Sequence, residues 1–182
     1  MKKLSLLFLI VFNLFACQQQ SEAELKDRID KIELEIKESK QLDAQKIEQL
    51  LDLYEALIAK KSKKDQPALL EKKAKYYASL GQHENALNVY EKIYNNYPNY
   101  EKRGEALFMQ AFITEVNYND LTKAENLYQQ YLNEYPGGDF AKDAKFSIEN
   151  LYLSPEELIK KFKEAEQNSK LDSLMVQGDI ES

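Results

Sequence analysis

One cysteine and one histidine are the side chains of this 182-residue chain best suited to nucleophilic or metal chemistry. His83 stands in the polar stretch 81–84, and because no second histidine exists, the helical metalloprotease motif is missing. A zinc cluster needs several cysteine or histidine ligands, and this chain has one of each. A catalytic Cys–His pair needs a free thiol, but the position of the single cysteine favours another use, described next. Neither a phosphate-binding glycine loop nor a glycine-flanked serine is present. The sequence therefore predicts no enzyme, no cofactor and no metal site.

The cysteine, Cys17, directly follows an apolar segment. Two lysines precede a run from residue 4 to residue 16 that is almost entirely apolar, the layout of an export signal and too short to span a bilayer. One interpretation of Cys17 is a leftover thiol beside an ordinary cleavage site. However, residues 14–17, Leu-Phe-Ala-Cys, resemble the bacterial lipoprotein processing box. The position of the cysteine therefore favours covalent attachment of diacylglycerol to Cys17.

This resemblance implies a membrane anchor made of acyl chains. Residues 1–16 would be a signal peptide, and residues 17–22 the lipidated cysteine with a short tether. Two or three acyl chains are sufficient to hold a protein on a bilayer. Since Gln18 follows the cysteine where aspartate would retain such a protein in the inner membrane, the resemblance implies the outer membrane. Residues 18–22 contain a single acid, which favours a periplasm-facing over a surface-facing position.

The charge of the chain argues against nucleic-acid partners. The formal net charge is −6, and removal of residues 1–16 takes away two lysines and no acid, which makes it −8. Such a charge repels phosphate backbones. A local exception is the basic segment 60–64, Lys-Lys-Ser-Lys-Lys. These lysines either stabilise the negative end of a helix dipole or contact a lipid headgroup or an acidic partner.

Two amphipathic helices are predicted in residues 23–66. Ser21 and Glu24 have the spacing of a capping box, and the apolar residues after them recur at steps of four, three and four. A second stripe begins near Asp43 and continues from Ile47 to Leu57. The first stripe is shorter than the three or four heptads typical of a coiled coil, which favours packing within the chain. A homo-oligomer stays open as the alternative.

Residues 86–98 share a pattern with residues 124–136, and every step is displaced by 38 residues. A small residue is followed by large apolar residues at four, seven and eleven, and then by proline, which is typical of the second helix of a helical-hairpin repeat. The paired positions are Ala86, Tyr90, Ile93, Tyr97 and Pro98, and Ala124, Tyr128, Tyr131, Tyr135 and Pro136.

These positions resemble the signature of the tetratricopeptide repeat. Counting back from the first proline places the remaining signature positions at Leu70, Ala74, Tyr77 and Gly81. The resemblance implies an all-α fold, a tetratricopeptide-like α-solenoid of antiparallel helix hairpins. Repeats are predicted at 67–100 and 101–136, with a partial repeat at 139–168 that includes a helix-start signature at Ser154. Residues 169–182 are expected to form a polar, disordered tail.

In this family the first helix of each repeat lines a binding groove. The resemblance therefore gives candidate partner-binding residues on two helices, namely Lys72, Lys75, Ser79, Phe108, Met109, Phe112 and Val116. The helix around residues 107–116 is apolar almost all round, which is typical of a buried helix. Phe108, Met109 and Phe112 thus either belong to the core or form an apolar strip for a peptide or partner helix.

The complete layout resembles two kinds of outer-membrane factor: the accessory lipoprotein of the β-barrel assembly machine and the repeat-bearing accessory protein of the Tol-Pal system. The likeness lies in the segment from Glu105 to Pro136. It implies a periplasm-facing scaffold that binds an envelope protein or peptide at the outer membrane. The alternative is a surface-displayed lipoprotein that acts in nutrient capture or adhesion as part of a transport complex.

Overall fold

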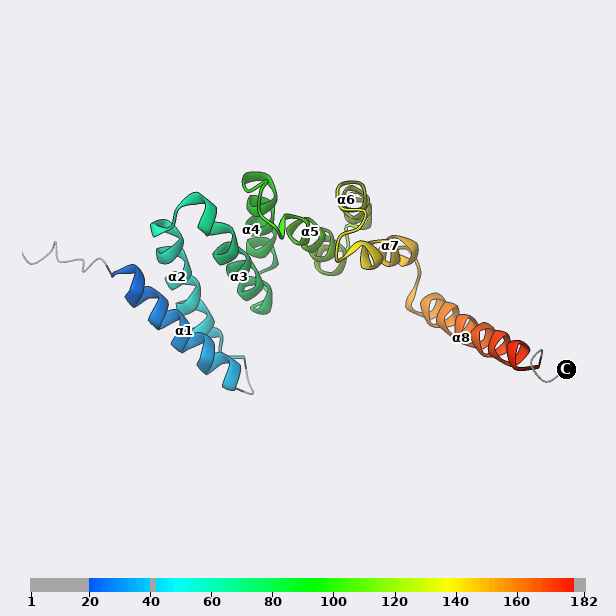
Figure 1. The fold of residues 1–182 in the computed structure, drawn as a ribbon. Helices are drawn as coiled ribbons and strands as arrows, with labels where there is room; N and C mark the ends of the chain where they lie inside the picture. Colours follow the sequence, from blue (N-terminus) through cyan, green and yellow to red (C-terminus); the bar gives the residue numbers. More distant parts are fainter. Residues whose placement is uncertain (1–19, 40–41, 179–182) are drawn as a thin grey trace, which may run out of the picture. The chain divides into compact units, whose positions relative to one another are not determined.

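The computed structural model describes residues 20–39 and 42–178, and within these ranges every regular element is a helix (Figure 1). The chain forms two compact units, which divide after Val89 within α4. The elements are α1 (Glu22–Glu38), α2 (Ala44–Lys60), the 3-10 turn η2 (Lys63–Asp65), α3 (Gln66–Ser79), α4 (His83–Asn96), α5 (Arg103–Tyr118), α6 (Leu121–Glu134), α7 (Ala141–Asn150) and α8 (Pro155–Gly178).

The first unit is built on an antiparallel hairpin of α1 and α2. The predicted capping box begins α1: the Glu24 amide donates to the Ser21 hydroxyl at 3.2 Å, and the Ser21 amide donates to the Glu24 carboxylate at 2.7 Å. Leu25 and Ile29 are the buried residues of α1, which packs against α2. The stripe of α1 is therefore used within the chain, as the sequence favours.

Helix α2 lies between α1 and α3, since it packs against both (Figure 1). Seven of its residues are buried, which explains why its apolar stripe is wide: Ile47, Leu50, Leu51, Leu53, Tyr54, Leu57 and Ile58. The Gln66 side chain joins α3 to the end of α2, because its amide donates to the carbonyls of Ile58 and Lys61. Helices α1 and α3 also meet directly, because Lys72 and Tyr76 of α3 donate to the Glu33 carboxylate of α1.

The second unit has its core between α5, α6 and α7. Phe108 is central, because its ring stacks on Phe140 with centroids 4.6 Å apart and lies 5.5 Å from Tyr128 and 5.9 Å from Tyr131. The buried members of the cluster are Leu107, Phe108, Ala111, Ala124, Tyr128, Tyr131, Ala141 and Ala144. Aromatic rings in tilted and stacked contacts therefore fill the space between these helices.

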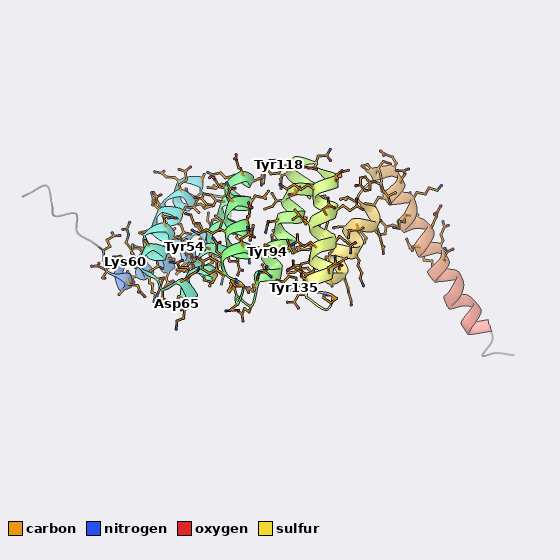
Figure 2. The ribbon with its side chains drawn as sticks, turned by 90° about the horizontal axis from the view of Figure 1, so that it is seen from above. Tyr54, Lys60, Asp65, Tyr94, Tyr118 and Tyr135 are labelled. Atoms are coloured by element: carbon orange, nitrogen blue, oxygen red, sulfur yellow. The ribbon has the colours of Figure 1, made fainter. Side chains whose placement is uncertain are left out.

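An arginine joins the end of α4 to α6 within the second unit. The Arg103 guanidinium lies 4.0 Å from the ring centroid of Tyr94, and its Nη1 donates to the Tyr135 hydroxyl at 2.7 Å and to Glu134 at 3.2 Å. Figure 2 shows Tyr94 and Tyr135 on the same side of this unit. The Arg103 guanidinium thus has an aromatic ring and two oxygen acceptors as partners within the chain, and we assign it a structural role in the second unit.

Both repeats turn at a residue with positive φ, and these residues are 38 positions apart. Gly81 has φ +71°, and Asn119, which takes the place of the usual glycine, has φ 52°. Asparagine tolerates this left-handed conformation better than other side chains do. The next amides, of Gln82 and Asp120, donate back to helix carbonyls at 2.9 and 3.2 Å. The substitution in the second repeat therefore preserves the turn.

Helix α8 begins as the sequence predicts and extends further. The Glu157 amide donates to the Ser154 hydroxyl at 3.2 Å, and the Ser154 amide donates to the Glu157 carboxylate at 2.8 Å. The helix then continues to Gly178, whereas the sequence analysis expects a disordered tail from residue 169. The physical reason is that residues 169–177 contain neither glycine nor proline, so no residue in this segment ends the helix.

Candidate functional site

A surface pocket of about 370 Å³ lies between α1, α2 and α3 in the first unit. Its apolar part comes from Ile36, Leu42 and Ile47, and its polar rim includes two lysines of α3. The complete lining is Glu33, Ile36, Leu42, Ile47, Lys72, Lys75, Tyr76 and Ser79. The pocket can therefore hold a group that is apolar at one end and negatively charged at the other.

Glu33 is the polar centre of this pocket. Its carboxylate accepts hydrogen bonds from the hydroxyls of Tyr54 and Tyr76 and from Lys72, whose Nζ lies 3.0 Å from both carboxylate oxygens. Burial raises the pKa of Glu33, but the hydrogen bonds from Tyr54 and Lys72 outweigh it and hold the pKa below its ordinary value. Burial and this carboxylate together raise the pKa of Tyr76 to about 12. Glu33 is therefore a stable anion that orients Lys72.

The other two predicted groove residues of α3 also line the pocket. The Lys75 ammonium lies 2.5 Å from the Glu71 carboxylate, and the Ser79 hydroxyl donates to the Tyr76 carbonyl at 2.8 Å. Lys72 and Lys75 are three residues apart, so they lie on one face of α3. The pocket residues that α1 and α2 supply could not be identified from the sequence pattern of the repeats. Their only signal is that Ile36 and Ile47 belong to apolar stripes that meet at the hairpin.

Helix α5 divides the predicted apolar strip between core and surface. Phe108 is 7% exposed and belongs to the aromatic core of the second unit, and Met109 packs against that core. Phe112 and Val116 are instead 42% and 58% exposed. Phe108 therefore belongs to the core, and of the four predicted residues of α5 only Phe112 and Val116 are exposed.

The repeat-signature residues have structural roles. Tyr77 is half-buried, Gly81 supplies the turn, and Pro98 and Pro136 are exposed residues that follow helices. The fully packed positions are Leu70, Ala74, Ala86, Tyr90, Ile93, Ala124, Tyr128 and Tyr131. These residues hold helices together and leave the exposed positions between them to determine binding.

Cys17 lies outside the residues that the structure describes. Within the described ranges, no group of three or more His, Cys, Asp or Glu side chains could hold a metal ion. Across the same residues, every helix is too short or too polar to cross a membrane. His83 is the first residue of α4, where it forms part of a helix start.

The comparisons with known proteins concern the middle of the chain. Residues 68–100 and 102–138 match the family model of the tetratricopeptide repeat. No curated protein and no solved structure shows significant similarity to the chain. The predicted fold class, an all-α, tetratricopeptide-like α-solenoid, is confirmed. Repeats of this family suggest binding to protein partners and are generally not enzymes. Residues 68–100 and 102–138 therefore resemble two consecutive tetratricopeptide repeats.

Proposed function

We propose that this chain is a membrane-anchored protein-interaction scaffold of the bacterial cell envelope. Acyl chains on Cys17 attach it to the outer membrane, and its helices face the periplasm. The repeats of residues 68–138 support the binding of a protein, and the apolar segment before Cys17 supports the lipid anchor. The partner is an envelope protein or a peptide segment of one.

The observation that carries this proposal is the pocket with Lys72 and Lys75 at its rim. Its apolar residues, Ile36, Leu42 and Ile47, fit a branched side chain, and the two lysines fit carboxylates beside it. Each lysine already contacts a carboxylate of the chain, so an incoming acid has to compete. Lys72 can exchange partners at little loss, because Glu33 keeps the hydroxyls of Tyr54 and Tyr76 as donors. The geometry favours a segment in which a leucine or isoleucine is flanked by acids.

Peptide titration tests this part of the proposal. A ten-residue peptide with one leucine between two glutamates should bind and shift the amide NMR signals of α3, whereas its glutamine counterpart should not. The double variant Lys72→Gln, Lys75→Gln should weaken binding about tenfold, because exposed ion pairs contribute up to about 1 kcal/mol each. The matched control is Lys142→Gln, Lys145→Gln, which removes two exposed lysines at the same spacing from α7. Equal affinity of both double variants would contradict the proposal.

The anchor and its orientation need separate measurements. Radiolabelled palmitate should enter the wild-type chain in cells and fail to enter the variant Cys17→Ser. Protease added to intact cells should leave the protein whole until the outer membrane is permeabilised. Degradation before permeabilisation would instead support the surface-displayed alternative.

A further inference from the structure

The hairpin of the first unit brings the basic segment 60–64 next to the start of α1. Lys61 forms an ion pair with Glu22, the first residue of α1, and Glu22 also contacts Lys26 at 3.0 Å. At the opposite end of the hairpin, Lys46 lies 2.7 Å from Glu35. The end of α2 and the start of α1 are therefore neighbours (Figure 1).

We call this end of the first unit the basic end. It comprises five lysines and three acids: Lys26, Lys60, Lys61, Lys63 and Lys64, with Glu22, Glu24 and Asp65. Figure 2 shows Lys60 and Asp65 at this end, beside the first residues of α1. Lys60, Lys63 and Lys64 are exposed. The basic end thus presents a net positive surface to solvent on a chain whose overall charge is negative.

The helix dipole explains only part of this surface. Lys60 lies in the last turn of α2, where a cation is stabilised by the carbonyl end of the helix. Lys63 and Lys64 form η2, immediately before the amide end of α3, where the same dipole disfavours a cation. These two lysines also follow the carbonyl end of α2, so the dipole of one neighbouring helix favours them and that of the other disfavours them. An anion outside the chain is the interaction that would favour them.

We propose that the basic end binds anionic lipid headgroups of the membrane to which Cys17 is attached. This inference rests on the proposed lipid anchor. Glu22 follows Cys17 by five positions, and such a tether spans at most about 18 Å, so it keeps the basic end near the bilayer surface. Attraction to anionic lipids acts over about 8 Å at physiological salt. Acyl chains combined with basic residues are an effective pair of membrane signals, and the second signal also orients the unit.

Vesicle binding by the unlipidated protein tests the basic end independently of the anchor. A Cys17→Ser chain that begins at residue 17 keeps every described helix. It should sediment with phosphatidylcholine vesicles that contain 30% phosphatidylglycerol and remain in solution with pure phosphatidylcholine. Because each lysine near an anionic surface contributes about a fivefold factor, the triple variant Lys60→Gln, Lys63→Gln, Lys64→Gln should lower the partition coefficient about a hundredfold.

The control is the triple variant Lys142→Gln, Lys145→Gln, Lys163→Gln, which removes the same charge from exposed positions of α7 and α8. Its binding should equal that of the parent chain, and circular dichroism should show equal helicity in all variants. The inference is overturned if both triple variants lose binding equally or if anionic lipid has no effect. It is also overturned if the basic-end variant binds polyglutamate more weakly than the parent chain does, but binds anionic vesicles equally well. If the proposed lipid anchor is wrong, the palmitate experiment shows this separately, because no label enters at Cys17.

Discussion

Two phenylalanines one turn apart on α5 give the sharpest test of how that helix is placed. Phe108 is 7% exposed and Phe112 is 42% exposed, although both belong to the same apolar segment. Replacing each in turn by alanine changes the same side chain on the same helix. The difference between Phe108→Ala and Phe112→Ala in the free energy of unfolding therefore reports packing, because the change in helix propensity is shared.

The expected difference follows from the surroundings of each ring. Phe108 contacts three aromatic rings, with centroids 4.6 to 5.9 Å away, so its removal leaves an enclosed cavity that cannot collapse fully. Truncation of a core phenylalanine costs about 3–5 kcal/mol. Phe112 is partly in solvent and leaves no enclosed cavity, so we expect a loss of about 1 kcal/mol from its lost contacts. The two variants should differ by about 2–4 kcal/mol.

Urea unfolding followed by far-ultraviolet circular dichroism measures the two free energies. Because two compact units can unfold separately, hydrogen exchange of the amides in α5, α6 and α7 should be measured as well. Protection in these helices should fall strongly in Phe108→Ala and slightly in Phe112→Ala. If Phe112→Ala is as destabilising as Phe108→Ala, the assignment of the two faces of α5 is wrong.

Three further outcomes can be measured in the same way. Gly81→Ala should cost about 1 kcal/mol because alanine is strained at φ +71°, whereas Gly137→Ala, which has open space and no positive φ, should leave stability unchanged. The fold lowers the pKa of Glu33, so its carboxylate stabilises the protein at pH values above the ordinary pKa of 4.5. This stabilisation is lost as the pH falls through the pKa of the folded state. In Glu33→Gln the melting temperature should therefore decrease less at acid pH than in the wild-type chain. Tyr128→Phe removes the hydroxyl that donates to Glu115 at 2.6 Å and should cost about 1 kcal/mol in urea unfolding.

Local signals in the sequence predicted the helix starts and the repeats. The capping boxes at Ser21 and Ser154 are present with both hydrogen bonds, because a capping box depends on four consecutive residues and little else. Apolar repeat positions such as Ala86, Tyr90 and Tyr128 are buried, whereas Pro98 and Pro136 are exposed, since small and large residues at fixed spacing determine how neighbouring helices pack. The match of residues 68–138 to the tetratricopeptide repeat agrees with these patterns.

The binding surfaces could not be predicted in the same way. An apolar run such as residues 107–116 does not reveal which side chains face the neighbouring helices. The sequence alone therefore cannot tell that Phe108 is buried and Phe112 is exposed. The pocket beside Lys72 combines residues from three helices, and its depth depends on how the α1–α2 hairpin meets α3. Helix α8 extends beyond residue 168 because residues 169–177, although mostly polar, contain neither glycine nor proline.

The two lysine surfaces of the first unit lie at opposite ends of one hairpin, and this separation assigns them different partners. Glu33, in the pocket, follows Glu22, at the basic end, by eleven residues of α1, or about 16 Å of helix. That distance exceeds the roughly 8 Å over which exposed charges interact at physiological salt. A bilayer at the basic end therefore leaves the pocket accessible to a protein. Lys60→Gln, Lys63→Gln, Lys64→Gln should weaken vesicle binding and preserve affinity for the acidic peptide, and Lys72→Gln, Lys75→Gln should do the reverse. Loss of both interactions in either variant would show that a single basic surface serves both.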